Sequence, residues 1–383
     1  MLQSVKIENF RGFKSFELQQ LGRINLLVGE NNSGKTSILE AIQLLCSRTN
    51  LEPLGEIMIN RGEYFWNDHL REERELDISH LFHNHEFQQD SAFYISGIND
   101  NVKEKFSITI GEIKSHLRFD VNDSNLNEEA KKEIFENLSS VLTSLNFRVI
   151  WEREEQQETL NISLSDNNCL DLKVIKRSSR DKRNKAPRII FINSSSLTTA
   201  KMTELFDEVV LNPEEEVATE ALKIIDQNIE RIAPANVQKA SQMMRLRSAE
   251  SHTGFYVRLT GSKQRVPIGS MGDGVWRILG IILATVCAKD GYLFIDEIDT
   301  GLHFTTMSDM WKLIWQTAKR LNVQIFATTH NNDCWKSLAD IVGQEHITED
   351  GIRIHRIEKG KENSIVFIEP EILIAAEENI EVR

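Results

Sequence analysis

A glycine-rich stretch near the start of this 383-residue chain is the clearest candidate for chemistry. Residues 29–36 read GENNSGKT, which fits the spacing G-x-x-x-x-G-K-[ST]. In such a loop the backbone N–H groups close around phosphate oxygens, the lysine reaches the β- and γ-phosphates, and the last hydroxyl ligates Mg²⁺. We therefore expect ATP and Mg²⁺ to bind at this loop. The residues concerned are Asn31, Asn32, Ser33, Gly34, Lys35, Thr36 and Ser37.

Two neighbouring carboxylates form the second candidate. Asp296 and Glu297 directly follow the apolar run 292–295, which reads YLFI. A carboxylate at the end of a buried strand lies where ligands bind in open α/β sheets. We expect Asp296 to hold Mg²⁺ and Glu297, which points elsewhere, to polarise the attacking water. The alternative is a solvated acidic turn, which the glycine-rich loop makes the weaker interpretation.

Three further short motifs complete an ordered set. Residues 270–274 read SMGDG, residues 299–301 read DTG, and His330 follows the apolar run 323–329. A histidine at the end of a strand can hydrogen-bond a γ-phosphate, although a lone histidine is more often an ordinary, partly buried side chain. The fixed order of all five motifs favours the phosphate role for His330.

Strands and helices at matching places would position these residues. Residues 23–28 are predicted to form a buried strand before the glycine-rich loop, and residues 35–47 a helix after it. The helix has an apolar face made by Ile38, Ile42 and Leu45. Its N-terminus adds partial positive charge to the phosphate site. A strand, a glycine-rich loop and a helix are together the context that the motif requires.

These motifs and the opening strand resemble those of a known group. Residues 5–13 read VKIENFRGF, and residues 296–303 read DEIDTGLH. With residues 270–274 in the place of the signature motif, the chain resembles the ABC-type ATPase branch that includes Rad50, SMC, RecF and the overcoming-lysogenization-defect (OLD) family. The second stretch is close to the OLD-like pattern DE-x-x-x-GLH. The resemblance covers residues 1–47 and 264–340 well and the middle poorly.

The resemblance implies a site shared between two subunits. In this branch the signature of one subunit closes on the nucleotide of the other, so Ser270 and Gly272 would contact the γ-phosphate in trans within a head-to-tail homodimer or a higher oligomer. Asp299 would belong to the loop that borders the nucleotide. Arg11 either reaches the γ-phosphate, as the family's arginine does, or is a solvated residue at a strand end.

Composition sets the broad class of the protein. With 40% hydrophobic and 27% charged residues, the chain is typical of a soluble protein. No stretch approaches the roughly 18 apolar residues of a membrane span, and no basic-then-apolar leader opens the chain. We therefore expect a cytoplasmic protein with no membrane partner. The four cysteines lack C-x-x-C spacing, which predicts a reducing compartment and no zinc site, and the apolar helical patterns around Cys46 and Cys287 predict core thiols.

One basic stretch lies within a chain whose net charge is −13, a charge that argues against non-specific coating of DNA. Seven of the thirteen residues from 176 to 188 are Lys or Arg, against the single Asp181. They could form a loop that binds DNA or a protein. A solvated loop between strands is the interpretation we favour, since no aromatic residues are interleaved. The cations are Lys176, Arg177, Arg180, Lys182, Arg183, Lys185 and Arg188.

The order of the motifs divides the chain into three blocks. Residues 1–47 hold the glycine-rich loop, residues 48–260 form an insertion, and residues 261–383 hold the signature, the carboxylates, His330 and the tail. The fold that we expect is α/β, a P-loop ABC-type ATPase head with an antiparallel β lobe and a helical insertion.

The insertion is predicted to contain both strands and helices. Residues 106–110, 147–151 and 162–164 alternate like half-buried strands and would extend an antiparallel sheet. A helix is expected from residue 130 to residue 145. Residues 203–232 read as one or two more helices, whose apolar face is either a core stripe or a dimerising arm.

The final block is predicted to end in a helix, a hairpin and a short helix. The helix spans residues 307–321, and the hairpin joins residues 351–356 to residues 365–368. The short helix spans residues 370–379.

The expected activity is slow, Mg²⁺-dependent ATP hydrolysis that serves as a switch. Full-length OLD nucleases continue into a TOPRIM metal-carboxylate domain, and the 53 residues after His330 are too few to hold one. We therefore expect a separately encoded, nuclease-like effector in a two-component defence or DNA-processing system. The alternatives are a RecF-like ATPase that acts on DNA alone and a transporter head, which the lack of an LSGGQ signature disfavours. The branch's glutamine loop has only Gln88 and Gln89 as candidates.

Overall fold

The structure is a computed structural model, and it describes ten ranges of the chain. These are residues 1–66, 74–114, 143–165, 167–178, 186–193, 197–210, 215–234, 255–262, 264–344 and 351–382. The helix expected over residues 130–145 lies mostly outside them. The prediction is wrong for its last three residues, 143–145, because they lie in a β-strand.

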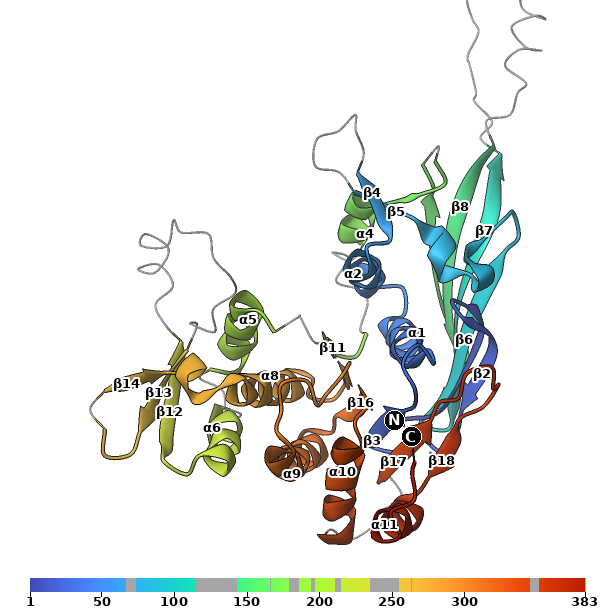
Figure 1. The fold of residues 1–383 in the computed structure, drawn as a ribbon. Helices are drawn as coiled ribbons and strands as arrows, with labels where there is room; N and C mark the ends of the chain where they lie inside the picture. Colours follow the sequence, from blue (N-terminus) through green and yellow to red (C-terminus); the bar gives the residue numbers. More distant parts are fainter. Residues whose placement is uncertain are drawn as a thin grey trace, which may run out of the picture.

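A six-stranded sheet carries the motif-bearing strands (Figure 1). Its members in spatial order are β11 (Ile189–Ile192), β15 (Tyr292–Ile295), β16 (Gln324–Thr328), β3 (Ile24–Val28), β17 (Ile352–Arg356) and β18 (Ile365–Phe367). All neighbours are parallel except β17 and β18. Every residue of β3, β15 and β16 is buried, as expected of strands covered on both faces. Their carboxyl ends meet at one edge of the sheet, which gathers the sequence motifs there.

A second six-stranded sheet is antiparallel and confirms the predicted β lobe. Its members in spatial order are β2 (Phe13–Leu18), β1 (Leu2–Phe10), β6 (Ala92–Asn99), β7 (Val102–Lys114), β8 (Thr143–Arg153) and β9 (Gln156–Ser163). In β7 and β8 the inward-facing side chains are large and buried; they include Phe106, Ile108, Phe147, Val149 and Trp151. Alternation between such residues and polar ones keeps one face of the sheet apolar.

Helix α1 (Lys35–Ser47) lies between the two sheets (Figure 1). Its apolar side chains, such as Ile38 and Ile42, share one core cluster with Phe93 of β6 and with Phe294 and Phe326 of the parallel sheet. Burial on opposite sides explains why ten of its thirteen residues are buried. The helix that begins at the glycine-rich loop is therefore fixed to both sheets.

The opposite face of the parallel sheet is covered by helices (Figure 1). They are α8 (Asp273–Cys287), α9 (Phe304–Leu321) and α10 (Asn332–Gln344), which share a core cluster with Leu26 and Ile295. Beyond them lie α5 (Thr199–Val209), α6 (Glu215–Ile225) and a small sheet of β12 (Ile229–Pro234), β13 (Phe255–Leu259) and β14 (Arg265–Pro267). The prediction of helix up to residue 232 is thus wrong at its end, where β12 begins.

Several short elements complete the part of the chain that the structure describes. They are α2 (Glu52–Arg61), β4 (Tyr64–Trp66), β5 (Arg74–Leu76), β10 (Leu170–Asp171), α4 (Leu172–Ser178), α11 (Glu369–Glu377) and the 3-10 turns η1 (Ile78–Leu81), η2 (His83–His85) and η3 (Ile268–Met271). Among the described helices, none is both long enough and apolar enough to cross a membrane. The middle block of the sequence contributes to both large sheets, because β11 lies beside β15.

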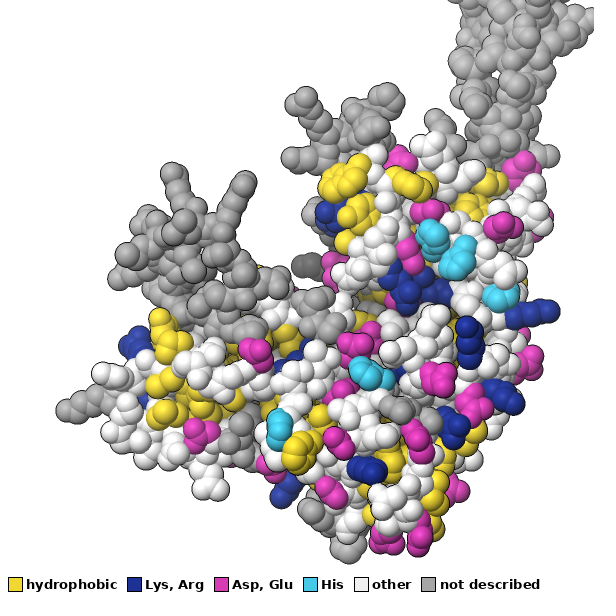
Figure 2. Space-filling view, in the orientation of Figure 1, with side chains coloured by type: hydrophobic (Ala, Val, Ile, Leu, Met, Phe, Trp, Pro, Cys, Tyr) yellow, Lys and Arg dark blue, Asp and Glu magenta, His cyan; other side chains and the backbone are white. Residues whose placement is uncertain are grey.

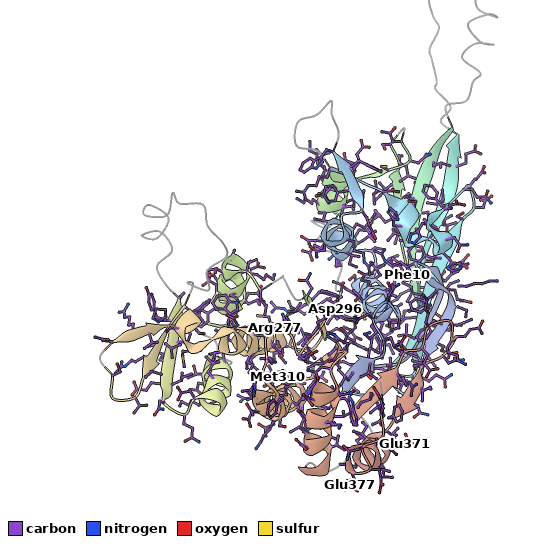
Figure 3. The ribbon with its side chains drawn as sticks, in the orientation of Figure 1. Phe10, Arg277, Asp296, Met310, Glu371 and Glu377 are labelled. Carbon is purple, nitrogen blue, oxygen red and sulfur yellow. The ribbon has the colours of Figure 1, made fainter. Side chains whose placement is uncertain are left out.

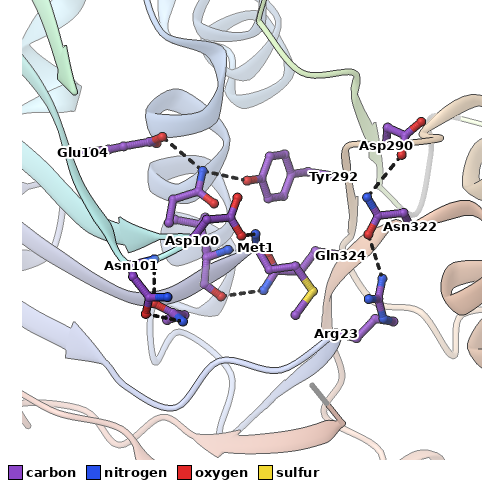
Figure 4. A network of polar contacts seen from close by, with 12 residues as sticks. Met1, Arg23, Asp100, Asn101, Glu104, Asp290, Tyr292, Asn322 and Gln324 are labelled. Carbon is purple, nitrogen blue, oxygen red and sulfur yellow. Dashed lines mark hydrogen bonds and ion pairs between the residues drawn. The ribbon is translucent and has the colours of Figure 1, made fainter. Parts of the chain in front are cut away.

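A polar network joins the two large sheets at the edge opposite the motifs (Figure 4). The Gln324 side chain accepts a hydrogen bond from the backbone N–H of Leu2 and donates to the Leu2 carbonyl, each at 2.8 Å. The Asn99 amide donates to the Tyr292 hydroxyl at 3.2 Å. Gln324 is 1% exposed, so its bonds replace those that burial takes from water. We call the contacts of Gln324 with Leu2 and of Asn99 with Tyr292 the rear clasp.

Candidate functional site

The glycine-rich loop connects β3 to α1, and both of its motif glycines are required by geometry. Gly34 has φ +97°, and an added Cβ would lie 2.4 Å from the Phe13 ring. Gly29 has φ +145°, and its added Cβ would lie 2.4 Å from the Ile357 carbonyl oxygen. These backbone conformations favour glycine. The two glycines therefore let the Phe13 ring and the Ile357 carbonyl pack closely against the loop.

The start of α1 is suited to an anion. Gly34 caps the helix without a side-chain hydrogen bond, and no acidic residue lies in the first turn. The first N–H groups of the helix and its partial positive charge are therefore left for a ligand. The Lys35 ammonium lies over the loop, where it donates to the carbonyls of Gly29 at 2.8 Å and Glu30 at 2.6 Å. This arrangement places a cation and backbone donors together.

Asp296, at the end of β15, faces the first turn of α1. The Thr36 hydroxyl donates to the two carboxylate oxygens of Asp296 at 3.1 and 3.0 Å. The Thr328 hydroxyl of β16 donates to the same carboxylate at 2.6 Å. A carboxylate and a hydroxyl are hard oxygen donors of the kind that Mg²⁺ takes from proteins. The donor set therefore fits the metal that the sequence predicted at Thr36 and Asp296.

The Glu297 backbone adopts the left-handed conformation, with φ +51°. Its N–H donates to the Thr328 hydroxyl at 2.8 Å, and the Thr300 hydroxyl lies 3.4 Å from its carboxylate. The neighbouring Asp299 is buried and accepts from the Thr329 hydroxyl at 2.6 Å. Two threonines at the end of β16 thus hold the loop that carries all three carboxylates.

His330 and the signature residues occupy different parts of the molecule. His330 directly follows Thr329 and is exposed at the motif-bearing edge. Ser270 lies in η3 and donates to the Pro267 carbonyl at 2.6 Å, and Gly272 has φ +96° just before α8. The η3 turn packs on the small β12–β14 sheet, which Figure 1 shows apart from α1. Within one chain, His330 lies at the same edge of the parallel sheet as the phosphate loop, whereas Ser270 and Gly272 lie beside the small β12–β14 sheet.

Arg11 is buried rather than solvated, so that alternative is wrong. It lies just after β1 and is 4% exposed. Its guanidinium contacts Glu40 at 2.9 Å and Glu63 at 2.6 Å. Burial raises the pKa of Glu40, and the positive charges of Arg11 and Arg61 oppose that rise. Contact between Arg11 and a γ-phosphate stays a prediction.

Arg61 and Glu40, which the sequence did not single out, extend this network towards Thr36 and Asp296. Arg61, at the end of α2, donates to Glu40 at 2.6 Å and to the Ser37 hydroxyl at 3.3 Å. A cleft of about 840 Å³ is lined by Arg61, Glu40, Thr36 and Asp296, among others. Glu40 follows Thr36 by one helical turn. The sequence signal for Glu40 was a carboxylate among the apolar residues of the helix that follows the glycine-rich loop.

The glutamine candidates lie elsewhere. Gln88 and Gln89 precede β6, and the Gln89 amide is 3.5 Å from the Glu112 carboxylate of β7. Both therefore belong to the antiparallel lobe. Asn193, directly after β11, and Gln43 of α1 are among the polar residues that line the cleft with Asp296.

The basic stretch is described only at its two ends. Lys176 and Arg177 lie on α4 and are exposed, whereas Arg188 pairs with Glu208 at 3.2 Å and donates to the Cys287 carbonyl. Residues 179–185 lie outside the described ranges. On the face drawn in Figure 2, acidic and basic side chains are interspersed among those described.

The chain is similar to several known proteins. The profile of the AAA ATPase domain family AAA_15 matches residues 1–334. An ATP/GTP phosphatase of Helicobacter pylori is 24% identical over 90% of this chain and 89% of its own length. A DNA replication and repair protein RecF of Oenococcus oeni is 24% identical over 54% of this chain and 69% of its own length. The SMC head domain of Thermotoga maritima superposes with a TM-score of 0.42 and 12% identity, over 96% of this chain and 98% of that one.

Proposed function

The chain belongs to the AAA_15 family of AAA ATPase domains, and we propose that it is a Mg²⁺-dependent switch that works as a head-to-tail dimer. It is an ATPase with a P-loop α/β head of the ABC type, in the branch that includes RecF. The observation that carries the proposal is the meeting of Lys35, Thr36 and Asp296 at one edge of the parallel sheet.

Each residue at this edge has a separate role in the proposed phosphoryl transfer. Backbone N–H groups of residues 31–36 and the Lys35 ammonium bind the phosphates, and Thr36 and Asp296 hold Mg²⁺. When bound, Mg²⁺ neutralises charge that develops on the phosphate oxygens. The Glu297 carboxylate orients the attacking water, and His330 donates a hydrogen bond to the γ-phosphate.

Sharing of the site between two chains is supported by the position of the signature. Ser270 is exposed and precedes α8 on the side of the molecule away from α1 (Figure 1). A second copy placed head to tail would bring Ser270 and Gly272 to the nucleotide, where a small side chain and a glycine leave backbone N–H groups accessible.

Mixing two inactive variants tests this sharing. Ser270→Arg places a bulky cation in the shared interface, whereas Lys35→Ala removes the phosphate-binding cation. Each alone should lack turnover, and an equal mixture should recover part of it because one composite site in each mixed dimer carries neither change. A mixture as inactive as its two components would contradict completion of the site in trans.

The switch is proposed to act on a separately encoded, nuclease-like effector. The support is the stretch from Asp296 to His303, which matches the OLD-like pattern. RecF proteins among the relatives favour a second candidate, an ATPase that acts on DNA without an effector. Purification of the tagged Glu297→Gln chain from its own host, with ATP, separates the two. A nuclease-like partner supports the first candidate, whereas a homodimer alone, together with DNA-stimulated turnover of the wild-type chain, supports the second.

A further inference from the structure

A buried arginine on α8 joins the ends of two neighbouring strands. Arg277 is 5% exposed, and one of its terminal nitrogens donates to the Asn193 carbonyl at 3.0 Å. The other donates to the carbonyls of Asp296 at 3.3 Å and Glu297 at 3.0 Å. Figure 3 shows Arg277 and Asp296 close together at the centre of the molecule. One side chain thus binds the chain just after β11 and just after β15.

The positive charge of Arg277 is balanced by nearby carboxylates. Burial lowers the pKa of its guanidinium, and the negative charges of Asp299, Glu297 and Asp296 counteract that effect. Arginine remains protonated in proteins, so a full positive charge lies behind three carboxylates. The planar guanidinium holds several acceptors in fixed directions, which a lysine ammonium on a flexible stem does not.

Glu297 needs such support because of its backbone conformation. A non-glycine residue at φ +51° is strained, and such a conformation persists only where neighbouring groups hold it. Two hydrogen bonds do so here, from the Glu297 N–H to Thr328 and from Arg277 to the Glu297 carbonyl. They fix the peptide on both sides of the Cα atom. The direction of the Glu297 side chain therefore depends on Arg277.

We propose that Arg277 is a positioning residue for hydrolysis, which holds Glu297 in the conformation that presents its carboxylate to the attacking water. Because Arg277 lies on the helix that directly follows Ser270 and Gly272, the signature and the water-orienting carboxylate are joined to one rigid element. The inference rests on the proposed role of Glu297 in the function above. It assigns to Arg277 no contact with nucleotide.

A double-mutant cycle between Arg277→Gln and Glu297→Gln tests this role. Nucleotide affinity, kcat, KM and the thermal unfolding midpoint are measured for each variant. Arg277→Gln should lower kcat by about 10²-fold, the effect of a displacement of about 1 Å, while ATP affinity stays within a factor of about three. Glu297→Gln should lower kcat by about 10²–10⁴-fold. The double variant should be no slower than Glu297→Gln, because Arg277 acts through that carboxylate.

Two further variants make the result decisive. Arg277→Lys retains the charge without the fixed fork, so its kcat should lie between those of the wild type and Arg277→Gln, and it serves if the glutamine variant does not fold. Arg320→Gln, at an exposed position on α9, is the matched control and should leave kcat unchanged.

Each outcome has one meaning. Wild-type kcat in both Arg277 variants, or multiplied losses in the double variant, would overturn the positioning role. If Glu297→Gln itself hydrolyses ATP at the wild-type rate, the proposed role of Glu297 fails instead. A normal Glu297→Gln defect beside silent Arg277 variants would refute only the inference about Arg277.

Discussion

Replacing Thr328 with valine should weaken both metal binding and folding. The Thr328 hydroxyl donates to Asp296 at 2.6 Å and accepts from the Glu297 N–H at 2.8 Å. Valine retains the shape and removes both bonds. Loss of a group that orients a metal ligand lowers metal affinity about 10- to 100-fold. The unpaired N–H lowers stability by about 1–3 kcal/mol.

The assay is ATP hydrolysis measured against Mg²⁺ concentration, together with thermal unfolding. The Mg²⁺ concentration at half-maximal rate should rise about 10- to 100-fold in Thr328→Val. Thr285→Val is the matched control, because the buried Thr285 hydroxyl donates to the Ile281 carbonyl at 2.7 Å within α8. It should lower stability without changing the Mg²⁺ dependence. An unchanged Mg²⁺ midpoint in Thr328→Val would refute the assigned role of its hydroxyl.

Three further predictions concern the phosphate loop and the core. Lys35→Ala should abolish detectable ATP binding in a fluorescent-nucleotide titration, because the cation over the loop is lost; retained binding would contradict its role. Gly34→Ala should lower stability by about 1–3 kcal/mol and weaken ATP binding, since φ is +97° there, whereas Gly12→Ala, with nothing within 4 Å of its added Cβ, is the tolerated control. Burial lowers the pKa of His355 to about 3, so the unfolded chain binds a proton that the folded chain does not; the free energy of unfolding should fall as pH drops from about 6.5 towards 3. His355→Gln should flatten that dependence in urea titrations, and an unchanged slope would count against it.

The elements closest to the motifs could be predicted because local signals determine them. The helix over residues 35–47 and the strand over residues 292–295 match α1 and β15 at both ends. Their apolar patterns and the spacing of the glycine-rich loop are properties of a few neighbouring residues. The hairpin of β17 and β18 was also predicted, but its parallel pairing with β3 depends on contacts distant in sequence.

Other parts depend on tertiary contacts that a single sequence does not show. The run of four apolar residues in β11 is too short to reveal that it lies beside β15. Residues 229–234 place Ile229 and Ile232 three apart, as in a helix, yet pairing with β13 makes them a strand. Arg277 lies in an apolar helix, and only the fold shows that its guanidinium reaches three carbonyls of two separate segments. Arg11 was expected either at the surface or in contact with the γ-phosphate. In the structure it is buried and paired with Glu40 of α1 and with Glu63, which follows α2.

The rear clasp has a mechanical consequence for the nucleotide site. Gln324 and Leu2 join the sheets at the end of β16 opposite the motifs, and backbone hydrogen bonds of Glu17 with residues 362 and 364 join β2 to the segment before β18. Helix α1 packs on both sheets. Because α1 is held by both sheets, a shift of one sheet relative to the other would act on α1 and change the position of its Thr36 end relative to Asp296.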